Sequence, residues 1–405
     1  MTATAAIRER VARLAWHADP ARPSRPYQLL RQSQWWDRER LERLQLDRLR
    51  TVLAAAAAVP FHRERLEAAG VRPGELRSIA DLRRVPELVR EDVQRLGVAR
   101  LSVPSARGQL RRTSGATGQP LVTLGSRSAS AWFQANDRRF NEWLGVSLGE
   151  RRISLPNRPA SMTTRSMAAA AALNITVVPG ASLADPAVVR NLAASLAGRP
   201  AALVTGVATG VFVLARSARE LGLELPIRAC WSGGGRLLPH HRDTIEAVLG
   251  RPVFERYRNV ENGAIAYQCP EERSFHVAAE TVLVELVRDD GEPAAPGELG
   301  HVLVTDLRNL AMPLVRYRLG DRAIAPERHD CRCGRGLPVL GQLTGRERDV
   351  LVRADGTLVP PDPVAWIITR KCESVLDFRV VQREDLASAY SSCSATTLRQ
   401  SSTGG

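Results

Sequence analysis

Lysine is almost absent from this chain, because Lys371 is the only one among 405 residues, whereas lysine and arginine together number 57. With 43 acidic residues the net charge is +14, and arginine supplies nearly all of the positive charge. The arginines are scattered among acids, as in Arg38-Glu39-Arg40, and are not massed in blocks. A basic protein can bind nucleic acid, but this patterning argues against a nucleic-acid partner.

Long apolar runs are also missing. The amino terminus carries arginines at positions 8, 10 and 13 and has no apolar segment of signal-peptide length. The longest mainly apolar stretch, residues 167–178, is rich in alanine, contains Asn174 and is too short to span a bilayer. We therefore expect a cytoplasmic protein with no membrane partner, in which the six cysteines stay reduced and serve as ligands or buried thiols.

A Gly-Lys-Ser/Thr sequence is absent as well, which excludes the phosphate loop of P-loop kinases. The chain has instead a run of small and hydroxyl residues, Arg112-Thr113-Ser114-Gly115-Ala116-Thr117-Gly118-Gln119-Pro120. Such residues let backbone N–H groups and hydroxyls close around phosphate oxygens, so the run indicates a nucleotide substrate. The same composition is also that of a plain turn, and this segment alone does not decide between the two.

Three further segments follow in order along the chain. They are Tyr257-Arg258-Asn259-Val260-Glu261, Met312-Pro313-Leu314-Val315-Arg316-Tyr317-Arg318-Leu319-Gly320-Asp321 and Gly345-Arg346-Glu347-Arg348-Asp349. With residues 112–120 they resemble the phosphate loop, the Tyr-Gly-x-Ser/Thr-Glu segment, the Arg-Tyr-Arg-x-Gly-Asp segment and the hinge of the adenylate-forming enzymes. The sequence of residues 49–86, including Val59-Pro60-Phe61-His62-Arg63, resembles the phenylacetate-CoA ligase-like branch of that superfamily. The resemblance covers roughly residues 35 to 385.

This resemblance implies an α/β fold with a large, multi-layer adenylate-forming domain of mixed sheets and helices and a small C-terminal α+β lid. Chain length agrees, since it exceeds one ordinary domain. We expect the large AMP-binding domain over residues 1–345 and a hinge with an abbreviated lid over residues 346–387. Residues 388–405 are small and polar with almost nothing to bury, which predicts a disordered tail.

Periodicity predicts several elements directly. Leu46, Leu49 and Leu53 recur at helical spacing before Pro60. Strand-like and helical runs alternate in the middle of the chain, as in an α/β layer fold, and antiparallel strands follow. The expected helices cover residues 38–58, 190–198 and 209–222, and the expected strands cover residues 201–206, 282–287 and 301–305.

The activity implied by the resemblance is ATP-dependent activation of a carboxylic acid to an acyl-adenylate. We expect an aromatic acid, followed by transfer to CoA, a carrier thiol or an amine. By resemblance the phosphates are held by Thr113, Ser114, Gly115, Thr117 and Gly118. Gln119 replaces the usual lysine and Ala116 a hydroxyl residue, which weakens ATP binding unless Arg111 or Arg112 compensates.

The other site residues are also assigned by resemblance. Tyr257 faces the adenine, Glu261 helps to hold magnesium, and Asp321 accepts the ribose hydroxyls. Gly234, in the run Ser232-Gly233-Gly234-Gly235-Arg236, lies beside the adenine and acyl group, and Arg346 reaches ribose or phosphate from the hinge. Thr117, Glu261 and Arg346 are the catalytic candidates. Arg258 stands where glycine is usual, and Val260 removes a hydroxyl donor to the α-phosphate.

Four residues form a metal-like set. Cys269 and His276 are seven positions apart, and Cys331-Arg332-Cys333 follows about sixty residues later. Three cysteines and one histidine suit tetrahedral zinc, and two tight pairs would clamp two loops together. The alternative is a set of reduced buried thiols. The branch that the chain resembles carries a similar arrangement, and four protein ligands would make the zinc structural.

The family's small domain ends in a lysine that contacts the carboxylate and the α-phosphate. Lys371 comes too early to be that residue, so we expect either a truncated lid or a protein that works without the lysine. A truncated lid would leave the site open to water, so we expect slow adenylation and little acyl-CoA formation. A catalytically impaired homologue that binds a nucleotide or acyl ligand as a partner protein is the alternative, and a homodimer is left open.

Overall fold

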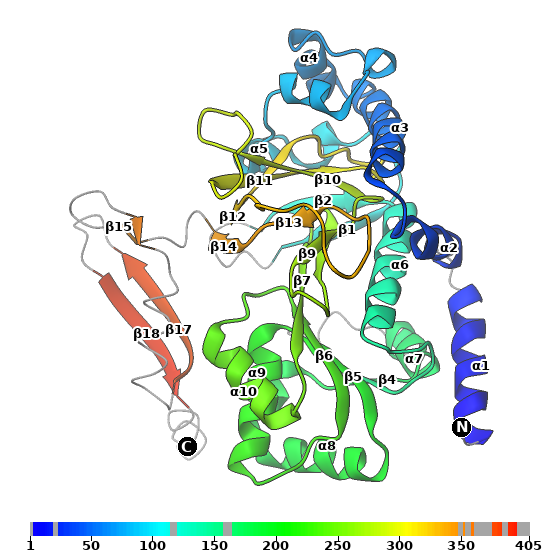
Figure 1. The fold of residues 1–405 in the computed structure, drawn as a ribbon, viewed down its shortest axis with the longest axis vertical. Coiled ribbons are helices and arrows are strands. Elements are labelled where there is room, and N and C mark those ends of the chain that lie inside the picture. Colours follow the sequence, from blue (N-terminus) through cyan, green and yellow to red (C-terminus); the bar gives the residue numbers. More distant parts are fainter. Residues whose placement is uncertain are drawn as a thin grey trace. The chain divides into compact units, whose positions relative to one another are not determined.

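The computed structural model describes residues 3–18, 23–113, 120–156, 164–346, 351–352, 358–359, 375–382 and 388–394. The chain divides into two compact units (Figure 1). The first comprises residues 1–12, 146–255 and 345–405, and the second comprises residues 13–145 and 256–344. The expected large domain therefore contributes to both units, because the chain passes between them more than once. The last passage lies between Thr344 and Gly345, next to the expected hinge.

The first unit contains parallel strands in the order β6-β5-β3-β4. Parallel neighbours need crossover connections, and helices supply them here. The expected alternation of strand and helix is confirmed, since β5 follows α8 and precedes α9. The elements are β3 (Arg152–Leu155), α7 (Thr164–Ala172), β4 (Ile175–Val177), η4 (Gly180–Ala184), α8 (Pro186–Gly198), β5 (Ala201–Gly206), α9 (Ala208–Glu220), β6 (Ile227–Gly233) and α10 (Pro239–Leu249).

The core of the first unit lies between this sheet and its helices. Val204 of β5 and Cys230 of β6 are fully buried, and Leu196 of α8 and Ile245 of α10 pack in the same cluster. Helix α8 begins at Asp185, whose carboxylate accepts a hydrogen bond from the N–H of Ala187 at 2.8 Å. Burial of one face of α8 in this cluster explains why residues 186–198 are rich in alanine and leucine.

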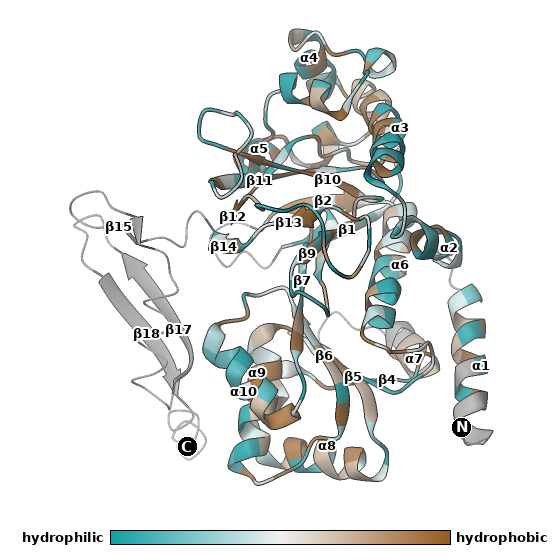
Figure 2. Ribbon diagram, in the orientation of Figure 1, coloured by the Kyte–Doolittle hydropathy of each residue, from teal (hydrophilic) through white to brown (hydrophobic). Residues whose placement is uncertain are grey.

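Helices cover the amino-terminal part of the second unit. Helix α3 begins after Asp37, whose carboxylate accepts a hydrogen bond from the N–H of Arg40 at 2.7 Å. It buries Leu49 and Leu53 at the predicted spacing, and Figure 2 shows its mixed hydrophilic and hydrophobic colouring. The helices are α1 (Ala3–Ala18), which crosses into this unit, α2 (Ser24–Ser33), α3 (Arg38–Ala57), α4 (Pro60–Ala68), α5 (Arg90–Leu101) and α6 (Arg127–Trp143), with short helices η1 (Pro73–Glu75) and η2 (Ile79–Arg84).

Antiparallel sheets make up the rest of the second unit, which confirms the strands expected at 282–287 and 301–305. One sheet has the order β10-β11-β12-β14, a second contains β13-β9-β8-β7, and β1 pairs with β2. The strands are β1 (Gln109–Arg112), β2 (Val122–Gly125), β7 (Val253–Asn259), β8 (Gly263–Gln268), β9 (Phe275–Val277), β10 (Val282–Val287), β11 (Leu299–Asp306), β12 (Tyr317–Ile324), β13 (Val339–Leu340) and β14 (Leu343–Arg346).

A buried ion pair fixes α6 against the turn that precedes β10. Nη1 of Arg139 lies 2.7 Å from Oε1 of Glu280, and the two side chains are 1% and 0% exposed. Ser33 at the end of α2 donates a hydrogen bond to the same carboxylate at 2.5 Å. Asn136 accepts a hydrogen bond from Nη2 of Arg139 at 2.9 Å. Three elements thus meet at one charged contact that is closed to water.

Short antiparallel pairs form the described part of the C-terminal segment. Strand β15 (Leu351–Val352) pairs with β16 (Leu358–Val359), and β17 (Val375–Gln382) pairs with β18 (Ser388–Ser394). For residues 388–394 the structure differs from the expected disordered tail, because a ladder of backbone hydrogen bonds to β17 needs no apolar side chains. Lys371 and residues 395–405 lie outside the described residues. None of the described helices has the length and apolar character of a membrane span.

Candidate functional site

Tyr257 and Asp321, the residues expected at adenine and ribose, lie against each other in the second unit. Tyr257 belongs to β7 and Asp321 to β12. The phenol of Tyr257 donates a hydrogen bond to Oδ2 of Asp321 at 2.6 Å. Both residues are only partly buried, so the pair is accessible from outside the core. The fold therefore joins two of the sequence motifs through one oriented carboxylate.

Glu261 and Tyr317 bring the same two motifs together a second time. The Glu261 side chain is 7% exposed, and its Oε1 lies 3.5 Å from the Tyr317 hydroxyl and 3.7 Å from Nη1 of Arg90. Burial, with the negative charge of Glu261 next, raises the pKa of Tyr317 well above its usual value, so the phenol stays protonated and donates. Arg90 lies at the start of α5, in no motif, and no local pattern in the sequence indicates its contact with Glu261.

The first arginine of the Arg-Tyr-Arg-x-Gly-Asp segment has a structural role. Arg316 is 4% exposed and adopts a positive φ of 51°. Its guanidinium contacts the Glu285 carboxylate at 3.1 Å and donates to the carbonyls of Arg83 and Val85 at 3.0 and 2.7 Å. These contacts lock the segment that carries Tyr317 and Asp321.

Only the edge of the predicted phosphate loop is described. Thr113 accepts a hydrogen bond from the N–H of Leu121 at 2.8 Å, and its own N–H donates to the Leu121 carbonyl at 3.0 Å, so the two ends of the loop are tied. Arg111, offered as a substitute for lysine, donates to Oγ of Ser130 at 3.2 Å, and Arg112 is exposed. Ser114, Gly115, Ala116, Thr117, Gly118 and Gln119 lie outside the described residues.

Gly234 and Arg346 belong to the first unit, whereas the pairs above belong to the second. Gly234 follows β6, is exposed and has a φ of +91°, a conformation that favours glycine. Arg346 is the exposed last residue of β14, and the rest of the expected hinge, Glu347 to Asp349, lies outside the described residues. The roles of both residues remain predictions from the resemblance.

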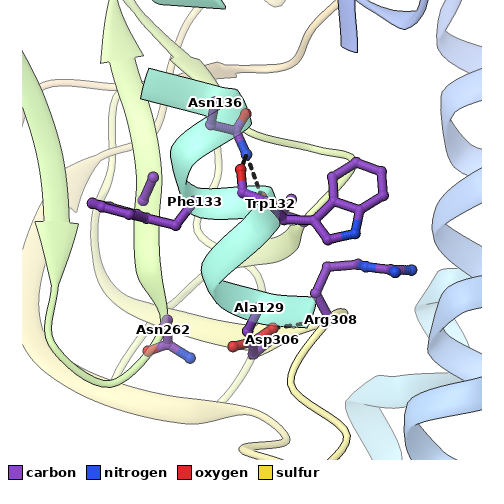
Figure 3. A pocket seen from close by; sticks show the side chains of 9 residues that line it. Ala129, Trp132, Phe133, Asn136, Asn262, Asp306 and Arg308 are labelled. Atoms are coloured by element: carbon purple, nitrogen blue, oxygen red, sulfur yellow. Dashed lines mark hydrogen bonds between the residues drawn. The ribbon is translucent and has the colours of Figure 1, made fainter. Parts of the chain in front are cut away.

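A pocket that the sequence did not predict opens beside α6 in the second unit (Figure 3). The pocket is small and partly open to solvent. Helix α6 supplies one wall, which is aromatic and polar. The opposite side includes Asn262, the residue that follows Glu261. The lining residues are Ala129, Trp132, Phe133, Asn136, Asn262, Ala264, Thr281, Asp306 and Arg308. The adjacent Trp132 and Phe133 could have indicated this pocket from the sequence. Two aromatic residues on a helix, however, ordinarily belong to the hydrophobic core.

Asp306 is the acidic group of this pocket. It is 3% exposed and accepts hydrogen bonds from the N–H groups of Arg308 and Asn309 at 2.8 and 2.9 Å. Burial raises its pKa to about 6, although these amides and the nearby arginines act in the opposite direction. The Arg308 guanidinium lies over the Trp132 ring at 4.5 Å. The pocket thus combines aromatic walls with groups of both charges.

The structure brings the four predicted metal ligands together. The candidate ligand atoms of Cys269, His276, Cys331 and Cys333 all lie within 4.8 Å of one another. Sγ of Cys331 is 3.7 Å from Sγ of Cys269, which matches the edge of a tetrahedron with zinc–sulfur bonds of about 2.3 Å. His276 directs Nε2 toward Cys333 at 3.2 Å, while its Nδ1 lies 3.2 Å from the Leu337 carbonyl. That carbonyl favours the tautomer whose Nε2 is free to bind a metal.

No family model matches the chain. A phenylacetate-coenzyme A ligase of Thermus thermophilus is 28% identical over 371 residues, which cover 86% of this chain and 79% of that protein. The Escherichia coli enzyme of the same name is 24% identical over 329 residues, covering 78% and 73%. The structure of 2-hydroxyisobutyryl-CoA ligase with 2-HIB-AMP superposes with a TM-score of 0.74 at 20% identity, covering 92% and 82%.

This chain shares the multi-sheet α/β fold of that CoA ligase, as expected from the sequence. The relatives found by sequence are ligases, which does not favour a non-catalytic binding protein. Sequence relatives and fold thus agree with the ordered motifs, and the chain is similar to phenylacetate-CoA ligases in sequence and to a CoA ligase in fold.

Proposed function

We propose that the chain is an acid–CoA ligase, which joins a carboxylate to the α-phosphate of ATP, expels pyrophosphate and passes the acyl group to the CoA thiol. The observation that carries this proposal is the double contact between two distant motifs, Tyr257 with Asp321 and Glu261 with Tyr317. These contacts supply a ribose acceptor and a buried carboxylate in one unit. The names of the relatives favour CoA over a carrier thiol or an amine as the acceptor.

Asp321 would bind the ribose. A carboxylate can accept hydrogen bonds from both hydroxyls of a vicinal diol. The Tyr257 phenol contacts Oδ2 and so limits the rotation of the carboxylate before the nucleotide arrives. Preorganisation of this kind lowers the entropic cost of binding.

Glu261 would hold magnesium. A hard cation prefers carboxylate oxygen, and Glu261 offers one in a nearly water-free position. Nη1 of Arg90 and the hydroxyl of Tyr317 lie 3.7 and 3.5 Å from Oε1. The bound ion would neutralise charge on the phosphates. The residues around Glu261 would orient the carboxylate and exclude water.

The acid would occupy the pocket beside α6, directly after Glu261 in sequence. Trp132 and Phe133 give it aromatic walls, which suit a planar ring, and this supports the expectation of an aromatic acid. Asn136 and Thr281 add neutral polar groups that can fix the orientation of a ligand.

The cysteine and histidine set would hold a structural zinc ion. The donor types, the 3.7 Å sulfur–sulfur distance and the orientation of His276 fit a tetrahedral site. Four protein ligands leave no position for substrate, so the ion would stabilise the loops that carry Cys269 and Cys331 rather than take part in the reaction.

The test is acid-dependent release of pyrophosphate from ATP with Mg²⁺ over a panel of aryl and aliphatic acids, followed by mass spectrometry of the CoA product. We expect at least one acid to give pyrophosphate and a matching acyl-CoA. Binding of nucleotide with no acid-dependent pyrophosphate from any acid would support the non-catalytic alternative.

A further inference from the structure

Arg258 replaces the glycine of the Tyr-Gly-x-Ser/Thr-Glu segment, and the structure shows where its side chain lies. Its guanidinium carbon is 5.3 Å from the centre of the Phe133 ring, and that of Arg256 is 5.4 Å from the same ring. Both arginines therefore extend from the face of β7 that meets α6. Tyr257, between them, turns the other way and binds Asp321. The strand thus separates the proposed nucleotide contact from Arg258.

The two arginines differ in their counter-charges. Arg256 forms an ion pair with Asp137, which also accepts a hydrogen bond from Tyr267 at 2.8 Å. For Arg258, no hydrogen-bonded or ion-paired partner is found in the part of the chain that the structure describes. Burial lowers the pKa of Arg258, and the like charge of Arg256 acts in the same direction. The Asp137 charge acts in the opposite direction, but that carboxylate is already ion-paired with Arg256. A half-buried cation without an ion pair of its own is costly and is normally balanced by an anion.

Arg258 also borders the pocket beside α6. It is paired in register with Ala264 on β8, and its ring partner is Phe133. Ala264 and Phe133 both line that pocket. A ligand held there would therefore contact two neighbours of Arg258, whose guanidinium forms no ion pair among the described residues. The acidic residue of the pocket, Asp306, is already hydrogen-bonded by two backbone amides.

We propose that Arg258 is a specificity-determining residue that pairs with a second anionic group on the acid, so that the preferred substrates are dicarboxylic acids. This inference rests on the proposed function and names the substrate class of the same site. An arginine–carboxylate contact is charge-assisted and can be bidentate, which makes it selective as well as strong. The acid is favoured over a nucleotide phosphate because Arg258 faces α6, whereas Tyr257 and Asp321 lie on the other side of β7.

The test compares pairs of acids that differ only in the second carboxylate, benzoate with isophthalate and butyrate with succinate. For each acid, kcat/KM for pyrophosphate release is measured with the wild type, Arg258→Met and Arg258→Lys. Arg190→Met, which removes an exposed arginine of α8, is the matched control for the loss of one charge. Calorimetric binding of each acid without ATP gives a second readout, and circular dichroism verifies folding.

We expect the wild type to prefer the diacid of at least one pair by about tenfold or more. Arg258→Met should abolish that preference, Arg258→Lys should keep part of it, and Arg190→Met should leave it unchanged. Diacid binding that depends on Arg258 without any pyrophosphate release would support this inference while refuting the proposed function. A preference for the monoacid that Arg258→Met does not alter would overturn the inference. So would a rise in KM for ATP in Arg258→Met with an unchanged acid preference, since that assigns Arg258 to the nucleotide.

Discussion

Tyr257 holds Asp321 through a hydrogen bond of 2.6 Å between its hydroxyl and Oδ2. The contact joins residues 64 positions apart in the sequence, from two different strands. Its chemical effect is to orient a carboxylate that would otherwise rotate in contact with solvent. The two residues should therefore contribute unequally, one by binding the nucleotide and the other by positioning its partner.

Asp321→Ala should reduce acid-dependent pyrophosphate release at least 100-fold, because it removes the proposed acceptor for the ribose hydroxyls. Tyr257→Phe keeps the ring and loses only the orienting hydrogen bond, so we expect a loss of about tenfold, seen mainly as a higher KM for ATP. Steady-state kinetics at varied ATP checks both. Asp290→Ala, an exposed aspartate, is the control. Equal effects in the two variants would contradict these separate roles.

Glu261→Gln should abolish pyrophosphate release at any Mg²⁺ concentration while the protein stays folded. Glutamine keeps the size of the side chain and loses the charge that a hard cation requires. The measurement is a magnesium titration of initial rates, with Glu298→Gln, an exposed glutamate, as control. Full activity of Glu261→Gln at high magnesium would show that the residue contributes affinity alone, and full activity at low magnesium would remove it from the site.

Purified protein should contain about one zinc per chain, and Cys331→Ser should lower both the metal content and the melting temperature, because metal binding is linked to folding. Elemental analysis and thermal unfolding measure the two effects. Cys230→Ala removes a buried cysteine of the first unit and should leave the zinc content unchanged. A metal-free preparation that melts at the same temperature after zinc addition would rule the site out.

Arg139→Met should lower the free energy of unfolding by about 3–5 kcal/mol, because it leaves the Glu280 carboxylate buried without its cation. The double variant Arg139→Met with Glu280→Gln should recover part of that loss. Urea denaturation of the single and double variants measures this. Arg38→Met breaks an exposed pair with Glu42 and should cost less than about 1 kcal/mol. Equal losses in Arg139→Met and the double variant would contradict the explanation.

Asp306 should make the protein less stable as pH rises. Burial raises its folded-state pKa from 3.8 to about 6, so the folded form binds its proton more tightly than the unfolded form. This contribution is complete below pH 4 and is lost as pH rises to about 6, by at most about 3 kcal/mol. Asp306→Asn should flatten the stability profile in that window, as measured by urea denaturation at several pH values. An identical slope in the variant would assign the effect to another group.

Local signals in the sequence predicted local structure well. The leucines at 46, 49 and 53 place α3 because their spacing matches a helix, and the four candidate metal ligands could be grouped because thiols and imidazole share a coordination preference. Arg90 could not be found in this way, since its approach to Glu261 depends on how α5 packs in the fold. The sequence showed that Arg258 replaces the usual glycine of its motif. The orientation of its side chain toward Phe133, however, depends on how β7 packs against α6.

The separation of 3.7 Å between the sulfur atoms of Cys269 and Cys331 would also link the proposed zinc content to oxidation. A disulfide needs a sulfur–sulfur distance of about 2.05 Å, so only a small movement would join the two thiols once no cation holds them apart. With the proposed zinc ion bound, both thiolates would be coordinated and protected from oxidants. Protein treated with a chelator in air would therefore be trapped in a cross-linked state, and zinc would restore it only after a reductant had been added.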